Sequence, residues 1–131
     1  MSCKELPHHH SHTHEAAKLA VQLGRSEDFQ GVSEIFKQLA DTSRVRIFWA
    51  LCHCEECVMN LSALVDMSSP AVSHHLRQLK ASGLVVSRRE GKEVYYKAAD
   101  SEAAHLLHDG IERIMAITCP DREFPRIEYG E

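Results

Sequence analysis

The chain has 131 residues, of which 44% are hydrophobic, and this is enough for one compact domain with a core but not for two. No apolar run approaches the roughly 18 residues that span a bilayer, and the N-terminus lacks the apolar segment of a secretory signal, so we expect a cytoplasmic protein without a membrane partner. In that reducing compartment, the five cysteines indicate metal ligands or redox groups rather than structural disulfides.

The formal net charge of −4 argues against a nucleic-acid partner by itself, but the charges are segregated along the chain. Positions 70–92 hold five basic residues and one acid, whereas positions 100–131 hold eight acids and three arginines. A basic segment within an acidic chain indicates a local surface for phosphate groups.

The N-terminal segment MSCKELPHHHSHTH contains five of the ten histidines and almost no apolar residues, which predicts a flexible arm. A helical pattern begins at Glu15, and the segment from Cys119 onwards, with Pro120 and Pro125, is expected to be irregular. We therefore divide the chain into a histidine-rich arm (1–14), one domain (15–118) and a C-terminal tail (119–131).

Apolar residues at helical spacing predict helices over 15–23, 29–41 and 42–52, followed by one or two helical turns over 60–67. Thr42 or Ser43 is expected to cap the third helix. The segment SSPAVSHHLRQLKASG (68–83) has the clearest helical pattern, with a cap at Ser68 or Ser69 and a stop at Gly83. Its expected buried stripe consists of Val72, Leu76 and Leu79.

After Gly83 the pattern alternates on both sides of Glu90-Gly91, which predicts a β-hairpin with its turn near 90–92. A last helix, capped by Asp100 or Ser101, is expected over 100–117. The predicted fold class is mainly α with a β-hairpin wing, that is, a winged helix-turn-helix. In such a fold one helix enters the major groove of DNA, while the hairpin beside it reaches the flanking phosphates.

The residues expected to face DNA are those of the 68–83 helix that the core does not use, together with the basic residues near the hairpin tip. They are Ser69, Ser73, His74, Arg77, Lys80, Arg88, Arg89 and Lys92. The alternative is a basic, solvated face without DNA contact.

The segments LADTSRVRIFWAL and SSPAVSHHLRQLKASGLVVSRREGKEVYYKA together resemble the ArsR/SmtB family of metal-responsive winged-helix repressors. The similarity runs from about Val32 to about Met115, and SHHLRQLKASGLV followed by REGKEVYY is far more specific than a generic helix-turn-helix. The resemblance implies a homodimer, built from the first and last helices, that binds double-stranded operator DNA when inducer is absent. It implies neither an enzyme nor an organic cofactor.

The stretch LCHCEECVMNL (51–61) places Cys52, Cys54 and Cys57 within six positions. The C-x-x-C spacing lets Cys54 and Cys57 bind one ion, and Cys52 can supply a third thiolate. In the resembling family a Cys-Val-Cys-Asp-Leu motif occupies this place, but here Met59 and Asn60 replace its second cysteine and its aspartate. A thioether is a poor ligand for Zn(II) or Cd(II), and three thiolates without histidine would suit arsenite, As(III). The alternative for Cys52 is a buried apolar residue at a helix end.

The resemblance implies a second possible site on the last helix, shared between protomers. Asp100 matches its first position, but Glu102, Arg113 and Ala116 occupy the others, so we expect that site to be absent or strongly altered. A weaker candidate on the same helix is a group of residues at steps of three and four, namely His105, His108 and Glu112. A solvent-facing polar stripe is the favoured interpretation of that group.

In a third arrangement, Cys3 and the histidines of one protomer's arm complete the cysteine site of the other protomer. Ordering the arm costs on the order of 1 to 2 kcal/mol per residue, so only a strong metal–thiolate site would offset it. The alternatives are a loose metal scavenger or no role.

The function expected from these residues is a sequence-specific repressor that is released from its operator by Zn, Cd or As(III) bound at cysteine thiolates. An alternative with the same fold is a redox or persulfide sensor, with a disulfide between Cys54 and Cys57 or between Cys57 and Cys119. A dithiol enzyme is disfavoured because no βαβ unit surrounds the C-x-x-C motif. A metal storage or transfer protein would rely on the arm and lack specific DNA binding.

Overall fold

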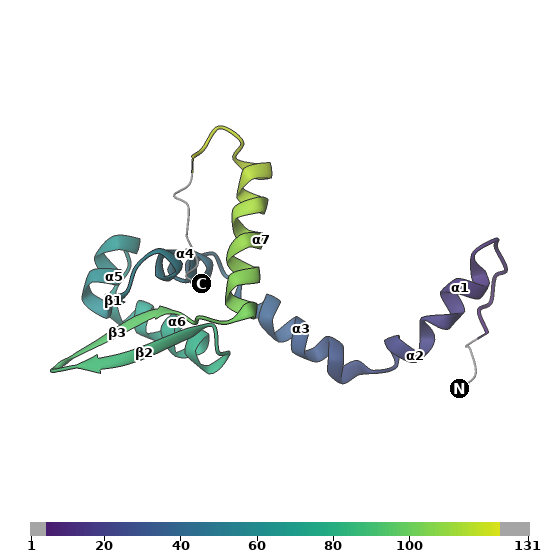
Figure 1. Ribbon diagram of the computed structural model, residues 1–131, viewed down its shortest axis with the longest axis horizontal. Helices are drawn as coiled ribbons and strands as arrows, with labels where there is room; N and C mark the ends of the chain where they lie inside the picture. Colours follow the sequence, from purple (N-terminus) through teal and green to yellow (C-terminus); the bar gives the residue numbers. More distant parts are fainter. Residues whose placement is uncertain (1–4, 124–131) are drawn as a thin grey trace. The chain divides into compact units, whose positions relative to one another are not determined.

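A computed structural model describes residues 5–123, and the chain divides into two units, Met1–Phe36 and Lys37–Glu131, each of which is described by itself (Figure 1). The first unit contains α1 (Thr13–Lys18), α2 (Ala20–Leu23) and most of α3 (Ser26–Gln38). The helix predicted over 15–23 is therefore two short helices, and the next one begins at Ser26 rather than at residue 29.

The described part of the second unit, after the end of α3, contains these elements in chain order: α4 (Thr42–His53), β1 (Glu56–Cys57), α5 (Val58–Val65), α6 (Ser69–Ala81), β2 (Val85–Glu90), β3 (Glu93–Ala98) and α7 (Glu102–Thr118). The predicted hairpin is formed by β2 and β3, and the fold is mainly α with a β-hairpin wing, as expected.

The sheet is antiparallel in the order β1-β3-β2, so the wing has a strand partner that the sequence did not indicate. Strand β1 pairs Glu56 with Tyr96 and Cys57 with Tyr95. Because β1 is two residues long, it shows no alternating pattern in the sequence. Its pairing attaches the segment that carries the cysteines directly to the wing.

The core of the second unit lies where α4, α5 and α6 meet the base of the wing. It includes the predicted stripe Val72, Leu76 and Leu79, each at most 1% exposed. The other large members are Ile47, Phe48, Leu51, Leu61, Leu84 and Val85. Burying a side chain of this size contributes about 1.5 to 3 kcal/mol, so this cluster fixes α6 on the rest of the unit.

Side-chain caps begin three of the helices. Ser68 accepts the N–H of Ala71 at the start of α6, and Ser101 accepts the N–H of Ala104 at the start of α7, in agreement with the sequence. The cap of α4 is Asp41, which accepts the N–H of Arg44, so the prediction of Thr42 or Ser43 was wrong by one or two residues. A carboxylate is stabilised here because it faces the positive end of the helix.

Among the described residues three have a left-handed backbone, namely two glycines and Asp66, which ends α5 with φ 55°. Gly83, with φ +80°, ends the α6 segment, and Gly91, with φ +62°, lies in the turn of the wing. Within the described residues, no helix is both long and apolar enough to cross a membrane.

Candidate DNA-binding surface and metal-binding sites

Helix α6 presents a polar face that the core leaves uncovered. His74, Arg77 and Lys80 are exposed, while Ser69 and Ser73 are half-buried. The Lys80 ammonium donates a 2.7 Å hydrogen bond to Ser87 Oγ on β2, which connects this face to the wing. The five α6 residues predicted to face DNA thus lie outside the buried stripe, on a helix whose register the core fixes.

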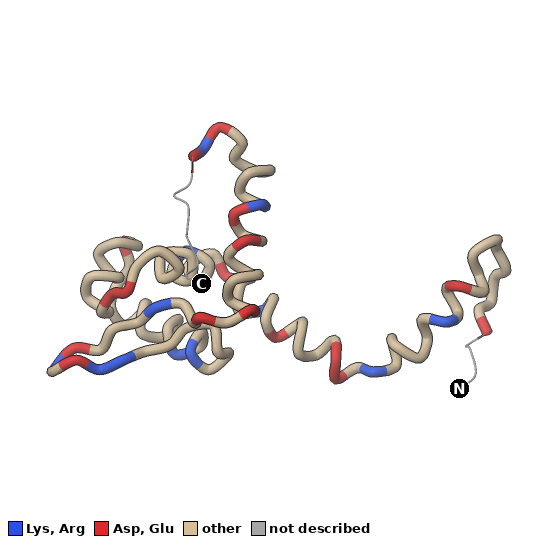
Figure 2. Tube along the Cα trace, in the orientation of Figure 1, with Lys and Arg blue, Asp and Glu red and all other residues tan. Residues whose placement is uncertain are grey.

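Arg88 and Arg89 on β2 and Lys92 in the following turn are exposed. Figure 2 shows basic and acidic positions side by side along this hairpin. Arg88 is not available as an isolated charge, however. Its guanidinium lies 2.6 Å from Glu55 Oε1 and 2.6 Å from Glu90 Oε2, and it stacks on the Tyr95 ring at 4.8 Å from the centroid. These hydrogen bonds raise the pKa of Arg88 and lower the pKa of Glu55. Two acids therefore compensate the charge of Arg88 in this conformation.

The three clustered cysteines lie on different local structures, and all are free thiols. Cys52 is in the last turn of α4, Cys54 caps that helix, and Cys57 belongs to β1 and precedes α5. The Cys54 thiol donates to the carbonyl of Ala50 at 3.2 Å. Cys119, the other free cysteine among the described residues, is exposed at the end of α7, and Cys3 lies outside the described residues.

Cys52 differs from the neighbouring Cys54 in the pKa of its thiol, because it is more buried. Cys52 packs against the core, and its burial, together with the nearby Glu112 carboxylate, raises the pKa of its thiol to about 12. Burial and Glu56 also raise the pKa of Cys54. A metal must therefore displace the thiol protons when it binds, and Cys52 resists this most.

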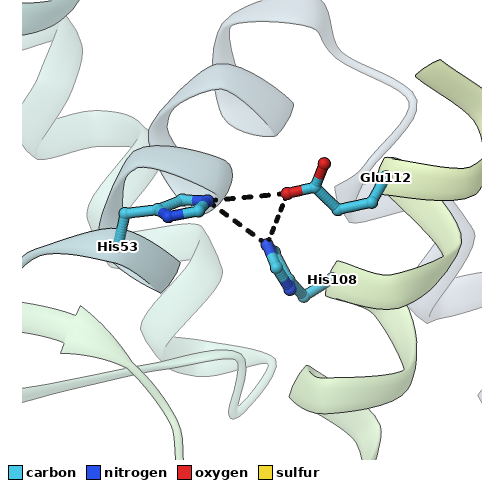
Figure 3. A group of neighbouring side chains, drawn as sticks. All are labelled: His53, His108 and Glu112. Atoms are coloured by element: carbon cyan, nitrogen blue, oxygen red, sulfur yellow. Dashed lines mark hydrogen bonds and ion pairs between the residues drawn. The ribbon is translucent and has the colours of Figure 1, made fainter. Parts of the chain in front are cut away.

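Residues from α4 and α7 converge on one point, where His53, His108 and Glu112 direct their polar atoms toward one another (Figure 3). The two Nε2 atoms of the histidines are 3.4 Å apart. Glu112 Oε1 lies 3.0 Å from His108 Nε2 and 3.6 Å from His53 Nε2. Between residues 5 and 123, this is the one group of three metal-binding side chains whose ligand atoms all lie within 4.8 Å of one another.

This geometry changes the histidine set suggested by the sequence. His105 is outside the group because it pairs with Asp100 at 2.9 Å, while His53 takes its place. His108 is only 4% exposed, so the interpretation as a solvent-facing stripe was wrong for that residue. His53 was missed because it precedes His108 by 55 residues. The only sequence signal for it was its position between two cysteines.

The environment of His53 favours its neutral form. Burial lowers the pKa of His53, and the neighbouring His108 lowers it further, while Glu112 acts in the opposite direction. Neutral imidazole is the form that binds metal ions. The histidines of the arm are exposed, and none of those at positions 8, 9, 10, 12 and 14 belongs to a comparable three-ligand group within the described part of the chain.

Comparisons with known proteins agree with this architecture. Residues 41–87 match the family described as "Bacterial regulatory protein, arsR family". The chain is 37% identical over 104 residues to a "Transcriptional repressor SmtB homolog" of Synechocystis sp., covering 79% of each chain. It is 39% identical over 93 residues to a "Cadmium resistance transcriptional regulatory protein CadC" of Listeria innocua, covering 68% of this chain and 78% of the relative.

Solved structures show the same fold. NolR from Sinorhizobium fredii superposes with a TM-score of 0.65 at 26% identity, covering 70% of this chain and 90% of NolR. A homodimeric winged helix-turn-helix DNA-binding domain from Mycobacterium bovis gives 0.65 at 25% identity, covering 78% of this chain and 94% of that one. The chain therefore belongs to the arsR family of bacterial regulatory proteins, and it is a winged-helix transcriptional regulator rather than an enzyme.

Proposed function

We propose that this regulator is a repressor that binds operator DNA in the cytoplasm as a homodimer, and that a metal or metalloid ion at Cys54 and Cys57 releases it. Relatives named as a transcriptional repressor and as a cadmium resistance regulator support the proposal. In the DNA-bound state α6 lies in the major groove, and the tips of the two wings contact backbone phosphates.

Each of the two units has exposed apolar residues that are available to the homodimer. On α7, Leu106, Ile114 and Ile117 expose 72%, 61% and 78% of their surface, and on α3, Phe29, Val32 and Phe36 expose half or more. Apolar side chains at helical spacing on two helices favour burial against a second copy. The homodimeric Mycobacterium bovis neighbour supports the same assembly.

The observation that carries the proposal is the connection between the cysteine segment and the wing. Glu55 lies between the two cysteines of the C-x-x-C motif and forms the ion pair with Arg88, and Cys57 itself pairs with Tyr95 of β3. When Cys54 binds an ion as a thiolate, it loses the hydrogen bond that its thiol now donates to the Ala50 carbonyl. Such a rearrangement acts on the wing through adjacent residues rather than over a distance.

The donor set favours thiophilic ions. Cys54 and Cys57 are half-buried free thiols, so an ion that reaches them is partly shielded from water. Cd(II), Zn(II) and As(III) bind such thiolates strongly enough to displace protons. Cys52 would join as the third ligand only for an ion that can deprotonate a thiol with a pKa of about 12. Cys3 from the arm remains a further candidate ligand.

Linkage sets a quantitative requirement on this mechanism. If the ion weakens operator binding by a given factor, operator DNA must weaken ion binding by the same factor, typically about 5- to 150-fold in allosteric proteins. An ion that binds the free and DNA-bound forms equally well releases nothing.

The test is a titration of the reduced, metal-free protein with Zn(II), Cd(II) and arsenite. Ultraviolet thiolate-to-metal absorption and the fluorescence anisotropy of labelled promoter DNA are recorded on the same samples. Thiolate absorption that rises in step with DNA release supports the proposal, and the ion with the largest coupling is the inducer.

Two variants test whether Cys54 and Cys57 are the ligands. They are the double variant Cys54→Ser/Cys57→Ser and the control Cys119→Ser. The proposal requires the double variant to bind DNA and ignore the ions, while Cys119→Ser behaves as the parent protein. DNA release by mild oxidation of metal-free protein, without release by any ion, would instead support the redox sensor.

A further inference from the structure

We propose that His53, His108 and Glu112 form a second metal site, which takes a divalent first-row cation such as Zn(II), Co(II) or Ni(II) (Figure 3). The site joins the last turn of α4 to α7. His53 lies between Cys52 and Cys54 in the sequence, but the ligands of this site are two imidazoles and a carboxylate rather than thiolates. The site does not depend on the proposed response of the cysteines to metal.

The spacing of the three atoms suits a tetrahedral ion. Ligands about 2.0 to 2.1 Å from a tetrahedral centre lie roughly 3.3 Å from one another. The three observed separations are 3.0, 3.4 and 3.6 Å. A circle through these atoms has a radius of about 1.9 Å, so an ion slightly out of their plane reaches all of them at normal bond lengths. The side chains therefore need little movement to bind.

The fold holds the ligands in place before any ion arrives. His108 and Glu112 are one turn apart on α7, so their side chains point to the same side of the helix. Trp49 stacks on His53 with ring centroids 4.3 Å apart, and its indole N–H donates to Glu112 Oε1 at 3.1 Å. Contacts of this kind orient ligands in metal sites and raise the affinity.

The site is shielded but accessible. The side chains of His108, His53 and Glu112 are 5%, 16% and 21% exposed, which limits competition from water. His53 and His108 also line a cavity of about 310 Å³, bordered by α4 and the start of α7, through which an ion can enter. Three protein ligands leave the fourth position of a tetrahedral ion to a small molecule or water.

The donor types decide the class of ion. Two imidazole nitrogens and one carboxylate oxygen suit zinc, cobalt and nickel, whereas arsenite prefers thiolates. The alternative is a hydrogen-bonded His–His–Glu network with no metal. In that network one Nε2–H donates and the other Nε2 accepts across 3.4 Å. In the metal-bound form both Nε2 lone pairs and the carboxylate bind the cation instead, and a Co(II) titration distinguishes the two forms.

The site also differs from the site on the last helix that the family resemblance implied. That arrangement joins two protomers, whereas His53, His108 and Glu112 come from one chain. An ion here ties α7 to α4 within a protomer. Because α7 carries the exposed Leu106, Ile114 and Ile117, the ion would fix the helix that presents the proposed dimer surface.

Trp49 is the single tryptophan of the chain and lies against the site, so its fluorescence reports binding. The experiment titrates Co(II) into the reduced full-length protein carrying Cys54→Ser and Cys57→Ser, which removes the cysteine site. We expect saturable quenching of Trp49 with d–d absorption of tetrahedral cobalt and no thiolate-to-cobalt band. Diamagnetic Zn(II) should reverse the quenching by competition.

Three variants in the same background complete the test. His108→Gln and Glu112→Gln should each weaken Co(II) binding by more than the roughly 10- to 100-fold that loss of a second-shell contact costs. His105→Gln, the matched control on the same helix, should bind as before. Circular dichroism verifies that each variant folds. One folded site variant is enough to test whether the ion binds at this site.

Two results would overturn the inference. One is saturable quenching that persists in a folded site variant, and the other is a lack of saturable quenching in the protein that retains His53, His108 and Glu112. Neither result bears on the cysteine proposal, because Cys54 and Cys57, which carry that proposal, are already replaced.

Discussion

Arg88 on the wing and Glu55 between two cysteines form an ion pair in which one carboxylate oxygen, Glu55 Oε1, accepts from Nη2 at 2.6 Å and from Nε at 2.8 Å. The pair connects residues 33 positions apart, and it links the segment between α4 and β1 to β2. The arginine that we propose to contact phosphate is thus held by an acid of the proposed sensor segment. Anything that moves Glu55 changes the charge that the wing offers to DNA.

Glu55→Gln should strengthen operator binding several-fold, because Arg88 then loses one of its two carboxylate partners and can contact phosphate. One added phosphate contact should steepen the dependence of log affinity on log salt by about 1. Fluorescence anisotropy over a range of salt concentrations measures both quantities. Glu93→Gln removes an equal charge from the exposed start of β3 and is the control. Equal gains in both variants would show only a general charge effect.

Arg77→Ala should weaken operator binding by about 1 to 3 kcal/mol, the usual loss for an arginine that contacts a base edge. Metal affinity should stay unchanged, since Arg77 is exposed on α6 and belongs to neither proposed metal site. Arg25→Ala, which removes an arginine paired with Asp28 on α3, is the matched control. Parent-like operator affinity in Arg77→Ala would contradict the placement of α6 in the groove.

Cys57→Ser should retain operator binding and lose the response to inducer, because the hydroxyl is a poor ligand for thiophilic ions. Anisotropy with and without the ion measures the ratio of the two affinities, which should fall to about 1. An unchanged ratio would move the sensor to the histidine site or to the arm.

Leu106→Glu and Ile117→Glu should each weaken the homodimer. Both side chains are more than 70% exposed on α7, and burying such a residue contributes about 1.5 to 3 kcal/mol. Sedimentation equilibrium should show a dissociation constant raised at least about tenfold. Met59→Glu, at a residue of α5 that is 75% exposed, is the control and should leave dimerisation unchanged. A dimer unaffected by both α7 changes would place the interface elsewhere.

Cys52 should react with iodoacetamide far more slowly than the exposed Cys119. With a pKa of about 12, only about one Cys52 thiol in 10,000 is ionised at pH 8, and the thiolate is the reactive form. Mass spectrometry of timed samples should find Cys52 unmodified until the protein is unfolded in urea. Rapid labelling of Cys52 in the folded protein would contradict its burial.

Local patterns predicted much of this fold because the relevant signals lie within a few residues. The caps Ser68 and Ser101, the apolar stripe of α6 and the glycine turn of the wing are each visible in the sequence. Asp41 was missed as a cap because three adjacent polar residues can all accept an N–H, and local sequence does not rank them.

The features that were missed depend on residues far apart in the chain. Strand β1 exists because β3 offers a hydrogen-bonding partner, and its two residues have no pattern of their own. His53 meets His108 and Glu112 only after α4 and α7 pack together. The Arg88 ion pair is hidden for the same reason. Composition located the basic wing, but only packing revealed which of its charges is already paired.

The short length of β1 has a consequence for how the protein behaves in a crowded cell. Because β1 pairs only with Tyr95 and Tyr96, Glu93 and Val94 near the tip of β3 have no strand partner on that side within the described residues, and β2 forms the opposite edge of the sheet. Free strand edges attract strands of other molecules, and charged side chains discourage this. We therefore expect the charges at the tip to discourage edge-to-edge pairing, and replacing them with β-branched residues should increase self-association.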